Sequence, residues 1–203
     1  MIKGIIFDLG GVILNNFDHS FYRKAELKYG IPENSLAKAC VRLWPPLEKN
    51  HISNGEFWKR VAADQRLDQK LARPLAALWI SYYHRYSKLN TPILTFAKKL
   101  RREYRVGVLS NTQREHTIFN KKRKLFQNFD FSILSDKVGT RKPEKRIYAI
   151  AVKKMRFRPK EIVFIDDEIK WIRAAKKIGI KTIHFKDLVT LKKDLTRISV
   201  NIK

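Results

Sequence analysis

The chain has 203 residues, of which 44% are hydrophobic and 11% aromatic, so it can bury one core, or a core with a small inserted domain, and it is not a disordered polymer. Cys40 is the only cysteine, which excludes an internal disulfide and a zinc site built from cysteines. The apolar run from Ile5 to Leu14 is short, contains Asp8 and lacks a cleavage-site pattern. We therefore expect no signal peptide, no membrane anchor and a cytoplasmic location.

The chain is strongly basic, with 44 Lys and Arg residues against 19 Asp and Glu residues and a net charge of +25. Most of the excess falls outside residues 15–90, in short runs of Lys and Arg that are typical of solvated helix faces. Such a charge is compatible with polyanionic partners, including nucleic acid and phosphorylated metabolites. A compositional bias toward lysine is the simpler explanation, so nucleic acid is an alternative partner rather than the favoured one.

The first predicted element is a short strand from Lys3 to Asp8, whose apolar residues do not alternate with polar ones, as in buried parallel strands. Residues 15–90 then show helical patterns only. Pro45 and Pro46 are expected to end one of these helices. The expected helices cover residues 20–29, 34–44, a segment that begins at a capping box at 53–56, and about 69–89.

From residue 91 onward, predicted helices alternate with short apolar strands. The strands are expected at 106–109, 131–134, 161–165 and 181–185, and the helices at 91–104, in a basic stretch before 131, at 143–155 and at 169–178. This alternation favours an α/β fold with a parallel sheet. The predicted organisation is a Rossmann-like core of residues 1–14 and 91–203, with an all-helical cap domain inserted at 15–90.

Polar side chains follow the predicted strands at the points where the strands end. In an open parallel sheet, ligands bind outside the carboxyl ends of the strands. Carboxylates, a hydroxyl group and an ammonium group at one such edge suit a hard cation such as Mg²⁺ together with a phosphate group. The residues concerned are Asp8, Ser110, Asp166 and Asp167, with Lys142 in a loop before a helix.

Four segments around these residues resemble, in order, the motifs of the haloacid dehalogenase-like hydrolases. They are Phe-Asp-Leu-Gly-Gly-Val at 7–12, Leu-Ser-Asn-Thr at 109–112, Arg-Lys-Pro-Glu at 141–144 and Phe-Ile-Asp-Asp at 164–167. The resemblance spans nearly the whole chain, and the helical insert lies where this superfamily has its cap. The chain looks closest to the branch with bacterial glucose-1-phosphate-type phosphatases and the N-terminal phosphatase domains of epoxide hydrolases.

The resemblance implies an enzyme, a Mg²⁺-dependent phosphatase that acts on a small phosphorylated metabolite through an aspartyl-phosphate. Asp8 would be the catalytic nucleophile. It would also hold Mg²⁺, together with the backbone carbonyl of Gly10 and the carboxylate of Asp167. Ser110, with the backbone N–H groups around Asn111, would bind the phosphoryl oxygens of the substrate.

Two further residues complete the implied site. Lys142 would be both catalytic and phosphate-binding, because it would balance the charges of Asp8 and the phosphoryl group. Asp166 would have a supporting role, in which it positions a metal-bound water.

Two positions depart from the family pattern. Most phosphatases of this superfamily have a second Asp two residues after the nucleophile, which serves as general acid, and here this position is Gly10. General acid help is commonly worth about 10²–10⁴-fold, so Gly10 favours substrates with good leaving groups. Four residues after Asp167, where the family usually has Asp or Asn, stands Trp171, which cannot orient metal-bound waters in the same way.

These departures keep two alternatives open. The first is a catalytically weakened phosphate-binding or regulatory protein of the same fold, which Gly10 and Trp171 would explain. The second is a phosphatase that acts on nucleotides or nucleic acid ends, which the basic core would explain. The aromatic residues of the insert are interpreted as the core of the cap rather than as a base-stacking surface; they are Trp44, Trp58, Trp79, Tyr82 and Tyr83.

Overall fold

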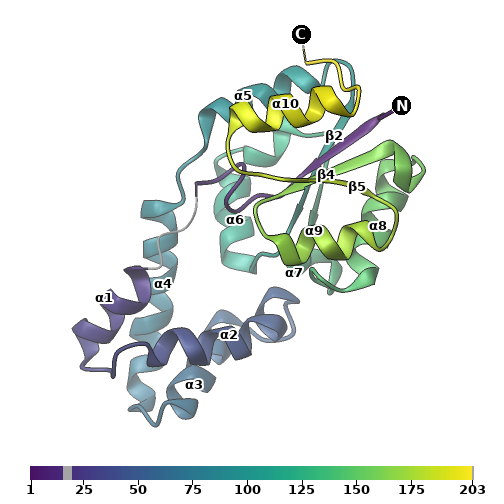
Figure 1. Cartoon of the computed structure of the whole chain (residues 1–203). Coiled ribbons are helices and arrows are strands. Elements are labelled where there is room, and N and C mark those ends of the chain that lie inside the picture. Colours follow the sequence, from purple (N-terminus) through teal and green to yellow (C-terminus); the bar gives the residue numbers. More distant parts are fainter. Residues whose placement is uncertain (16–19, 203) are drawn as a thin grey trace.

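The computed structural model describes residues 1–15 and 20–202, and it consists of an α/β domain and a separate lobe of helices, the cap lobe (Figure 1). The predicted start of the cap at residue 15 adjoins residues 16–19, and the predicted core ends at residue 203. Residues 16–19 and residue 203 lie outside the described residues. The two domain boundaries therefore stay predictions, whereas the fold class can be compared directly.

Five parallel strands form one sheet in the order β3-β2-β1-β4-β5. The strands are β1 (Gly4–Phe7), β2 (Arg105–Ser110), β3 (Phe131–Leu134), β4 (Ile162–Asp166) and β5 (Lys181–His184). The central strand β1 is fully buried and pairs with β2 on one side and β4 on the other. This confirms the predicted parallel α/β fold. Because the strands run in one direction, the carboxyl ends of β1, β2 and β4 lie together at one edge of the sheet.

Helices cover both faces of the sheet, as a parallel sheet requires. One face packs against α5 (Thr91–Leu100) and α10 (Leu188–Arg197), and the other against α8 (Lys145–Met155) and α9 (Ile169–Lys176). Side chains of β1 alternate between the two faces. Ile5 and Phe7 join the first layer, whereas Ile6 joins the second. The sheet is thus held rigidly between two apolar layers, and only its edges can carry polar groups.

The cap lobe contains α1 (Ser20–Tyr29), α2 (Ser35–Glu48), α3 (Asn54–Asp64) and α4 (Ala72–Tyr86). Its apolar side chains form a cluster of their own, to which Trp58, Trp79 and Tyr82 belong and against which Trp44 packs. The expected packing of these aromatic residues is confirmed. Tyr83 is the exception, because it packs into the cluster of the α/β domain. Among the described residues, no helix is long and apolar enough to cross a membrane.

The predicted end of α2 at Trp44 is wrong, because the helix continues through Pro45 and Pro46 to Glu48. Proline usually ends a helix because it lacks an N–H and crowds the preceding turn. Here both prolines lie near the end of the helix, and their carbonyl groups still accept hydrogen bonds from the N–H groups of Lys49 and His51. The additional turn extends α2 as far as the α/β domain.

Other predicted boundaries are also wrong. The helix from Thr91 ends at Leu100 rather than Tyr104, and the stretch 69–89 divides into a 3-10 turn at Gln69–Leu71 and α4. Three short elements were not predicted as such, in addition to the longer helix α10; they are the short helix α7 (Ser135–Val138) and the 3-10 turns at Leu125–Asn128 and Pro159–Glu161. The basic stretch before β3 contains α6 (Arg114–Lys122), as expected.

The helix α10 was not predicted, although its sequence carries a signal. Asp187 caps its first turn by accepting a hydrogen bond from the N–H of Thr190 at 2.7 Å. Leu188, Leu191 and Leu195 then recur at helical spacing and face the sheet. An N-cap followed by such a stripe is a recognisable start of an amphipathic helix.

The middle of the sheet leaves no room for a side chain at Gly107, whose added Cβ would clash with the ring of Phe131, its partner on β3. We expect Gly107→Ala to lower the free energy of unfolding by about 1–3 kcal/mol, because the rigid ring must shift in a packed core. At Gly4 the Cβ would meet the flexible side chain of Met155 instead. Gly4→Ala should therefore lower the free energy of unfolding by less than Gly107→Ala does. Denaturant titration of both variants would measure the difference. Wild-type stability of Gly107→Ala would contradict this packing.

Candidate active site

A buried ammonium group lies between two buried carboxylates at the carboxyl edge of the sheet. The Nζ atom of Lys142 is 2.7 Å from Oδ1 of Asp8 and 2.6 Å from Oδ2 of Asp166. Asp8 directly follows β1, Asp166 ends the adjacent β4, and Lys142 comes from the loop before α8. The side chain of Lys142 is only 1% exposed. Since charges are buried in proteins only when they are paired, the three groups form one electrostatic unit.

Two carboxylates share this single ammonium group, so two buried negative charges face one positive charge. This excess of negative charge changes the pKa values of the site. Burial raises the pKa of Asp8 to about 7, an effect that Lys142 opposes and that Asp166 strengthens. Burial lowers the pKa of Lys142, but Asp8 and Asp166 together raise it by more, so the lysine is charged. Burial and Asp166 also raise the pKa of Asp167. The site therefore has an excess of negative charge, which a cation would neutralise.

The donor atoms at this edge fit a hard divalent cation. Carboxylate oxygens of Asp8, Asp166 and Asp167 lie within 4.8 Å of one another. Both oxygens of Asp166 already accept hydrogen bonds, one from Lys142 and one from the N–H of Glu168. Asp8 and Asp167 both line the neighbouring cavity, as does Gly10. A few carboxylate and carbonyl oxygens beside an open space are what Mg²⁺ uses, because it keeps several waters.

The side chain of Asn111 holds the loop that carries Lys142. Its Oδ1 accepts a hydrogen bond from the N–H of Lys142 at 2.8 Å, and its Nδ2 donates to the carbonyl of Lys142 at 3.0 Å. The structure thus gives the Asn111 side chain a positioning role that was not predicted, since the sequence motif points only to the backbone at this residue. Ser110 ends β2, is buried, and lines the same cavity as Asp8.

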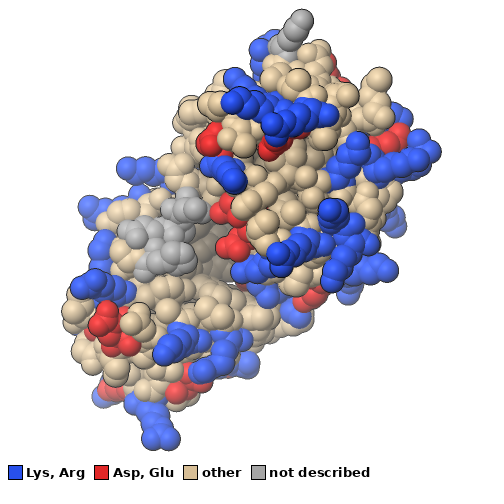
Figure 2. Space-filling model, in the orientation of Figure 1, with Lys and Arg blue, Asp and Glu red and all other residues tan. Residues whose placement is uncertain are grey.

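These residues open onto a cavity of about 340 Å³ between the α/β domain and the cap lobe, which we call the catalytic cavity. Figure 2 shows the recess between the two parts of the molecule. The cap contributes Trp44 and Glu48 to the lining, and both come from the end of α2. On the face shown, Lys and Arg side chains are spread over both parts rather than gathered in one patch (Figure 2).

The two positions that depart from the family pattern both line the catalytic cavity. A Cβ atom built on Gly10 would meet no atom within 4 Å, so the missing side chain leaves open space. The ring of Trp171 lies 4.6 Å from the Nζ of Lys170 and 5.9 Å from the guanidinium carbon of Arg141. Trp171 therefore packs beneath cationic side chains at the rim of the cavity.

A contact between the cap lobe and the loop of Lys142 was also not predicted. Arg141 donates from Nε to Oε2 of Glu48 at 2.5 Å. A second, longer pair joins Lys49 and Glu144 at 3.3 Å. Arg141 belongs to one of the four sequence motifs, but its partner could not be assigned because α2 was expected to end four residues earlier.

The chain matches the family model of haloacid dehalogenase-like hydrolases over residues 2–179. It belongs to this family. The match covers all four motifs and the helical insert, so the predicted family is confirmed and the chain is a hydrolase.

Individual relatives agree with this assignment. The chain is 27% identical to a D-ribitol-5-phosphate phosphatase of Bacteroides thetaiotaomicron, over 97% of this chain and 98% of that enzyme. It is 24% identical to bifunctional epoxide hydrolase 2 of Sus scrofa, over 98% of this chain but only 39% of that enzyme. A crystal structure of a wild-type HAD family enzyme of Bacteroides thetaiotaomicron, in complex with magnesium and inorganic phosphate, superposes with a TM-score of 0.74 at 25% identity. The superposition covers 94% of this chain and 99% of that one.

Asp8 is expected to lower the stability of the metal-free protein above neutral pH. Its pKa is raised from 3.8 to about 7 in the folded protein, so the folded state binds the proton more tightly than the unfolded state does. Stability then falls as the pH rises between about 4 and 7. Asp8→Asn removes this titration.

With a chelator present at about pH 8, we therefore expect a higher free energy of unfolding for Asp8→Asn than for the wild type. The difference should become small toward pH 4 and disappear near about pH 3, where Asp8 is protonated in both states. Urea titrations at the two pH values would measure it. A variant that is less stable than the wild type at pH 8 would contradict the burial of this charge.

Proposed function

We propose that the chain is a Mg²⁺-dependent phosphatase that hydrolyses a small phosphorylated metabolite through an aspartyl-phosphate on Asp8. The placement of Asp8 against Lys142, at the floor of a cavity that Asp167 and Ser110 also line, carries this proposal. The comparisons support it, since a relative is a D-ribitol-5-phosphate phosphatase and a similar crystal structure holds magnesium together with inorganic phosphate.

Asp8 is the nucleophile of the proposed reaction. One of its carboxylate oxygens forms a bond to phosphorus while the bond from phosphorus to the leaving oxygen breaks, and the leaving oxygen keeps that electron pair and takes a proton from water. Water then attacks the phosphorus of the acyl phosphate, which frees the carboxylate and inorganic phosphate. The reaction is divided into two easier displacements in this way. The deep position of Asp8 keeps its carboxylate oriented toward the catalytic cavity.

Mg²⁺ would be held by Asp8, the carbonyl of Gly10 and Asp167, and it supplies positive charge that lets an anionic carboxylate approach an anionic phosphate. Lys142 contributes a second positive charge at Asp8 and, during transfer, at the phosphoryl oxygens. Asn111 keeps Lys142 in place through its two hydrogen bonds to the backbone. Ser110, with the backbone N–H groups near Asn111, binds the remaining phosphoryl oxygens.

Asp166 supports these groups without direct contact with the substrate. It is fully buried, and its two oxygens hold Lys142 and the N–H of Glu168. The latter bond fixes the start of α9 just after Asp167, so Asp166 orients two other members of the site. We propose that it also positions a metal-bound water.

Hydrolysis of an aryl phosphate tests the proposal directly, because this substrate needs little protonation of its leaving group. We expect Mg²⁺-dependent turnover by the wild type, loss of turnover with a chelator, and no detectable turnover by Asp8→Asn. The folding of Asp8→Asn is checked by its unfolding curve. Equal activity of Asp8→Asn would contradict the proposal. Phosphate binding without any turnover by the wild type would favour the alternative of a binding or regulatory protein.

The open space at Gly10 allows a gain of function. Gly10→Asp places a carboxyl group two residues after the nucleophile, and nothing within 4 Å of the added Cβ opposes it. We expect alkyl phosphates, which are poor leaving groups, to be hydrolysed faster by up to about 10²-fold, since a general acid contributes that much or more. The rate of hydrolysis of aryl phosphates should increase little in Gly10→Asp, because their leaving groups need little protonation. Gly10→Asn is the matched control, because it has the same shape but no acidic proton, and an equal gain in both variants would contradict this explanation.

A further inference from the structure

A cavity of about 260 Å³ lies between the cap lobe and the α/β domain, and among the residues that the structure describes it shares no lining residue with the catalytic cavity. Its cap wall runs from the end of α2 to the start of α3, with Leu47 and Asn54. Its other wall is the first turn of α6, with Arg114 and Glu115. We call it the polar cavity. The proposed phosphatase reaction makes no use of this space.

Two oxygen atoms of the lining are buried without a hydrogen-bond partner among the described residues. They are Oδ1 of Asn54 and Oε2 of Glu115. Asn54 is only 6% exposed, so bulk water has little access to its amide group. A buried acceptor without a donor costs free energy, which a donor group on a ligand recovers. Because one of the two acceptors is a carboxylate, an ammonium group is the donor that suits the pair best.

The polar cavity also offers partners for a negative group. Arg114 and Glu115 are neighbours in the chain, but within the described part of the chain neither forms an ion pair. The first turn of α6 has no side-chain cap, since the N-cap residue Gln113 makes no capping hydrogen bond. Uncapped N–H groups at a helix start carry partial positive charge, which favours a carboxylate. A carboxylate near Arg114 would therefore meet a guanidinium group and free N–H groups.

The charges of the lining select against ligands with one kind of charge. Arg114 and Glu115 bring one formal charge each, of opposite sign, and His51 is the other titratable residue of the lining. A metal ion or a polyamine would meet Arg114, and a phosphate group would meet Glu115. Leu47, which is 2% exposed, and Ile52 add aliphatic surface. The lining therefore matches a small ligand that carries both charges and a short aliphatic part.

We infer that the polar cavity binds a zwitterionic amino acid with a small aliphatic side chain, at a site separate from the catalytic cavity. The ammonium group of the ligand donates to Asn54 and Glu115, and its carboxylate lies against Arg114 and the start of α6. Since Asn54 belongs to the cap lobe and Glu115 to the α/β domain, the ligand joins the two parts and stabilises their association. The inference goes beyond the proposed phosphatase function and does not depend on it.

Matched ligands test this inference by isothermal titration calorimetry of the wild-type protein. L-Valine carries both charges, isovalerate lacks the ammonium group and isobutylamine lacks the carboxylate. We expect saturable binding of L-valine, with an affinity about tenfold or more above those of both analogues, because each analogue loses charge-assisted hydrogen bonds. L-Alanine and L-leucine cover smaller and larger side chains. Absence of saturable binding by all three amino acids, or equal affinities for L-valine and its two analogues, would overturn the inference.

Substitution of the carboxylate tests the residues. Glu115→Gln keeps the size of the side chain but removes its charge, and it should weaken the binding of L-valine about tenfold or more. Glu56→Gln alters an exposed carboxylate of the cap paired with Arg60, and as the matched control it should leave the affinity unchanged. The unfolding curve of each variant shows whether it is folded. Unchanged affinity for L-valine in Glu115→Gln, or an equal loss in Glu56→Gln, would overturn the assignment.

Discussion

The buried ammonium group of Lys142 between Asp8 and Asp166 is the interaction on which the rest of the site depends. A buried ammonium group left without any carboxylate partner typically costs about 3–5 kcal/mol, so the surrounding structure has to keep a carboxylate beside Lys142. The parallel pairing of β1 with β4 brings the two carboxylates to adjacent strand ends. The amide of Asn111, from the other neighbour of β1, fixes the backbone of Lys142. The ends of three neighbouring strands thus supply Asp8, Asp166 and Asn111, which together hold Lys142 in place.

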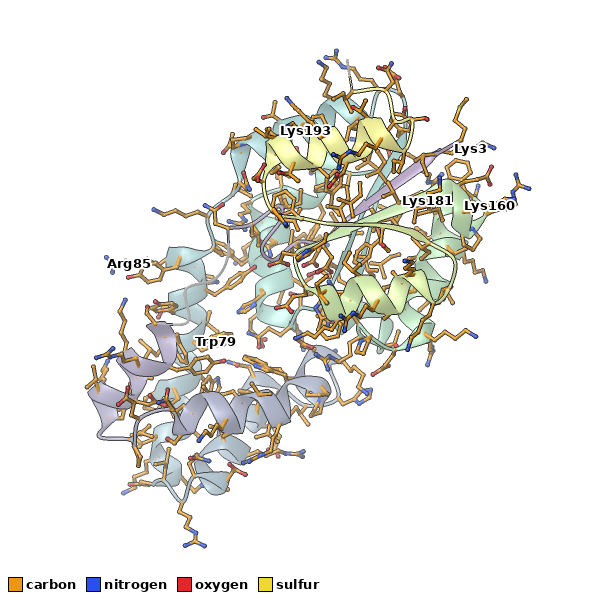
Figure 3. All side chains as sticks on the ribbon, viewed as in Figure 1. Lys3, Trp79, Arg85, Lys160, Lys181 and Lys193 are labelled. Atoms are coloured by element: carbon orange, nitrogen blue, oxygen red, sulfur yellow. The ribbon has the colours of Figure 1, made fainter. Side chains whose placement is uncertain are left out.

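The same loop connects this charge cluster to the cap. Arg141, which precedes Lys142, holds Glu48 at the end of α2, so the cap contributes a carboxylate to the lining of the catalytic cavity. The chain thereby separates two roles. In the proposed reaction, the α/β domain would carry the phosphate chemistry with Asp8 and Lys142, and the space between the domain and the cap would contact the leaving group. Part of the large positive charge lies far from this space, since Lys3, Lys160 and Lys181 lie at the end of the α/β domain away from the cap (Figure 3).

Much of the fold and of the candidate site was predictable from local sequence patterns. The strands, the helical insert and the four motifs follow from hydrophobic spacing and from polar residues at strand ends, and they place Asp8, Ser110, Lys142 and Asp167 at one edge of a parallel sheet. Contacts between residues far apart in the sequence left no such pattern. The bonds of Asn111 to Lys142 and of Glu48 to Arg141 depend on tertiary packing, and the second was hidden further by a helix that continues through two prolines. Trp79 was predicted only as cap core, because its contact with His116 depends on the packing of α4 against α6.

The most direct test of the account is to trap the phosphorylated enzyme. Wild-type protein is mixed with Mg²⁺ and excess aryl phosphate, quenched during turnover, reduced with borohydride and digested for peptide mass spectrometry, since reduction converts an aspartyl-phosphate to homoserine. The account predicts homoserine at position 8 and at no other aspartate, with the signal absent when Mg²⁺ or substrate is omitted. Turnover with no modification at position 8, or with the modification at Asp166 or Asp167, would contradict the central role of Asp8.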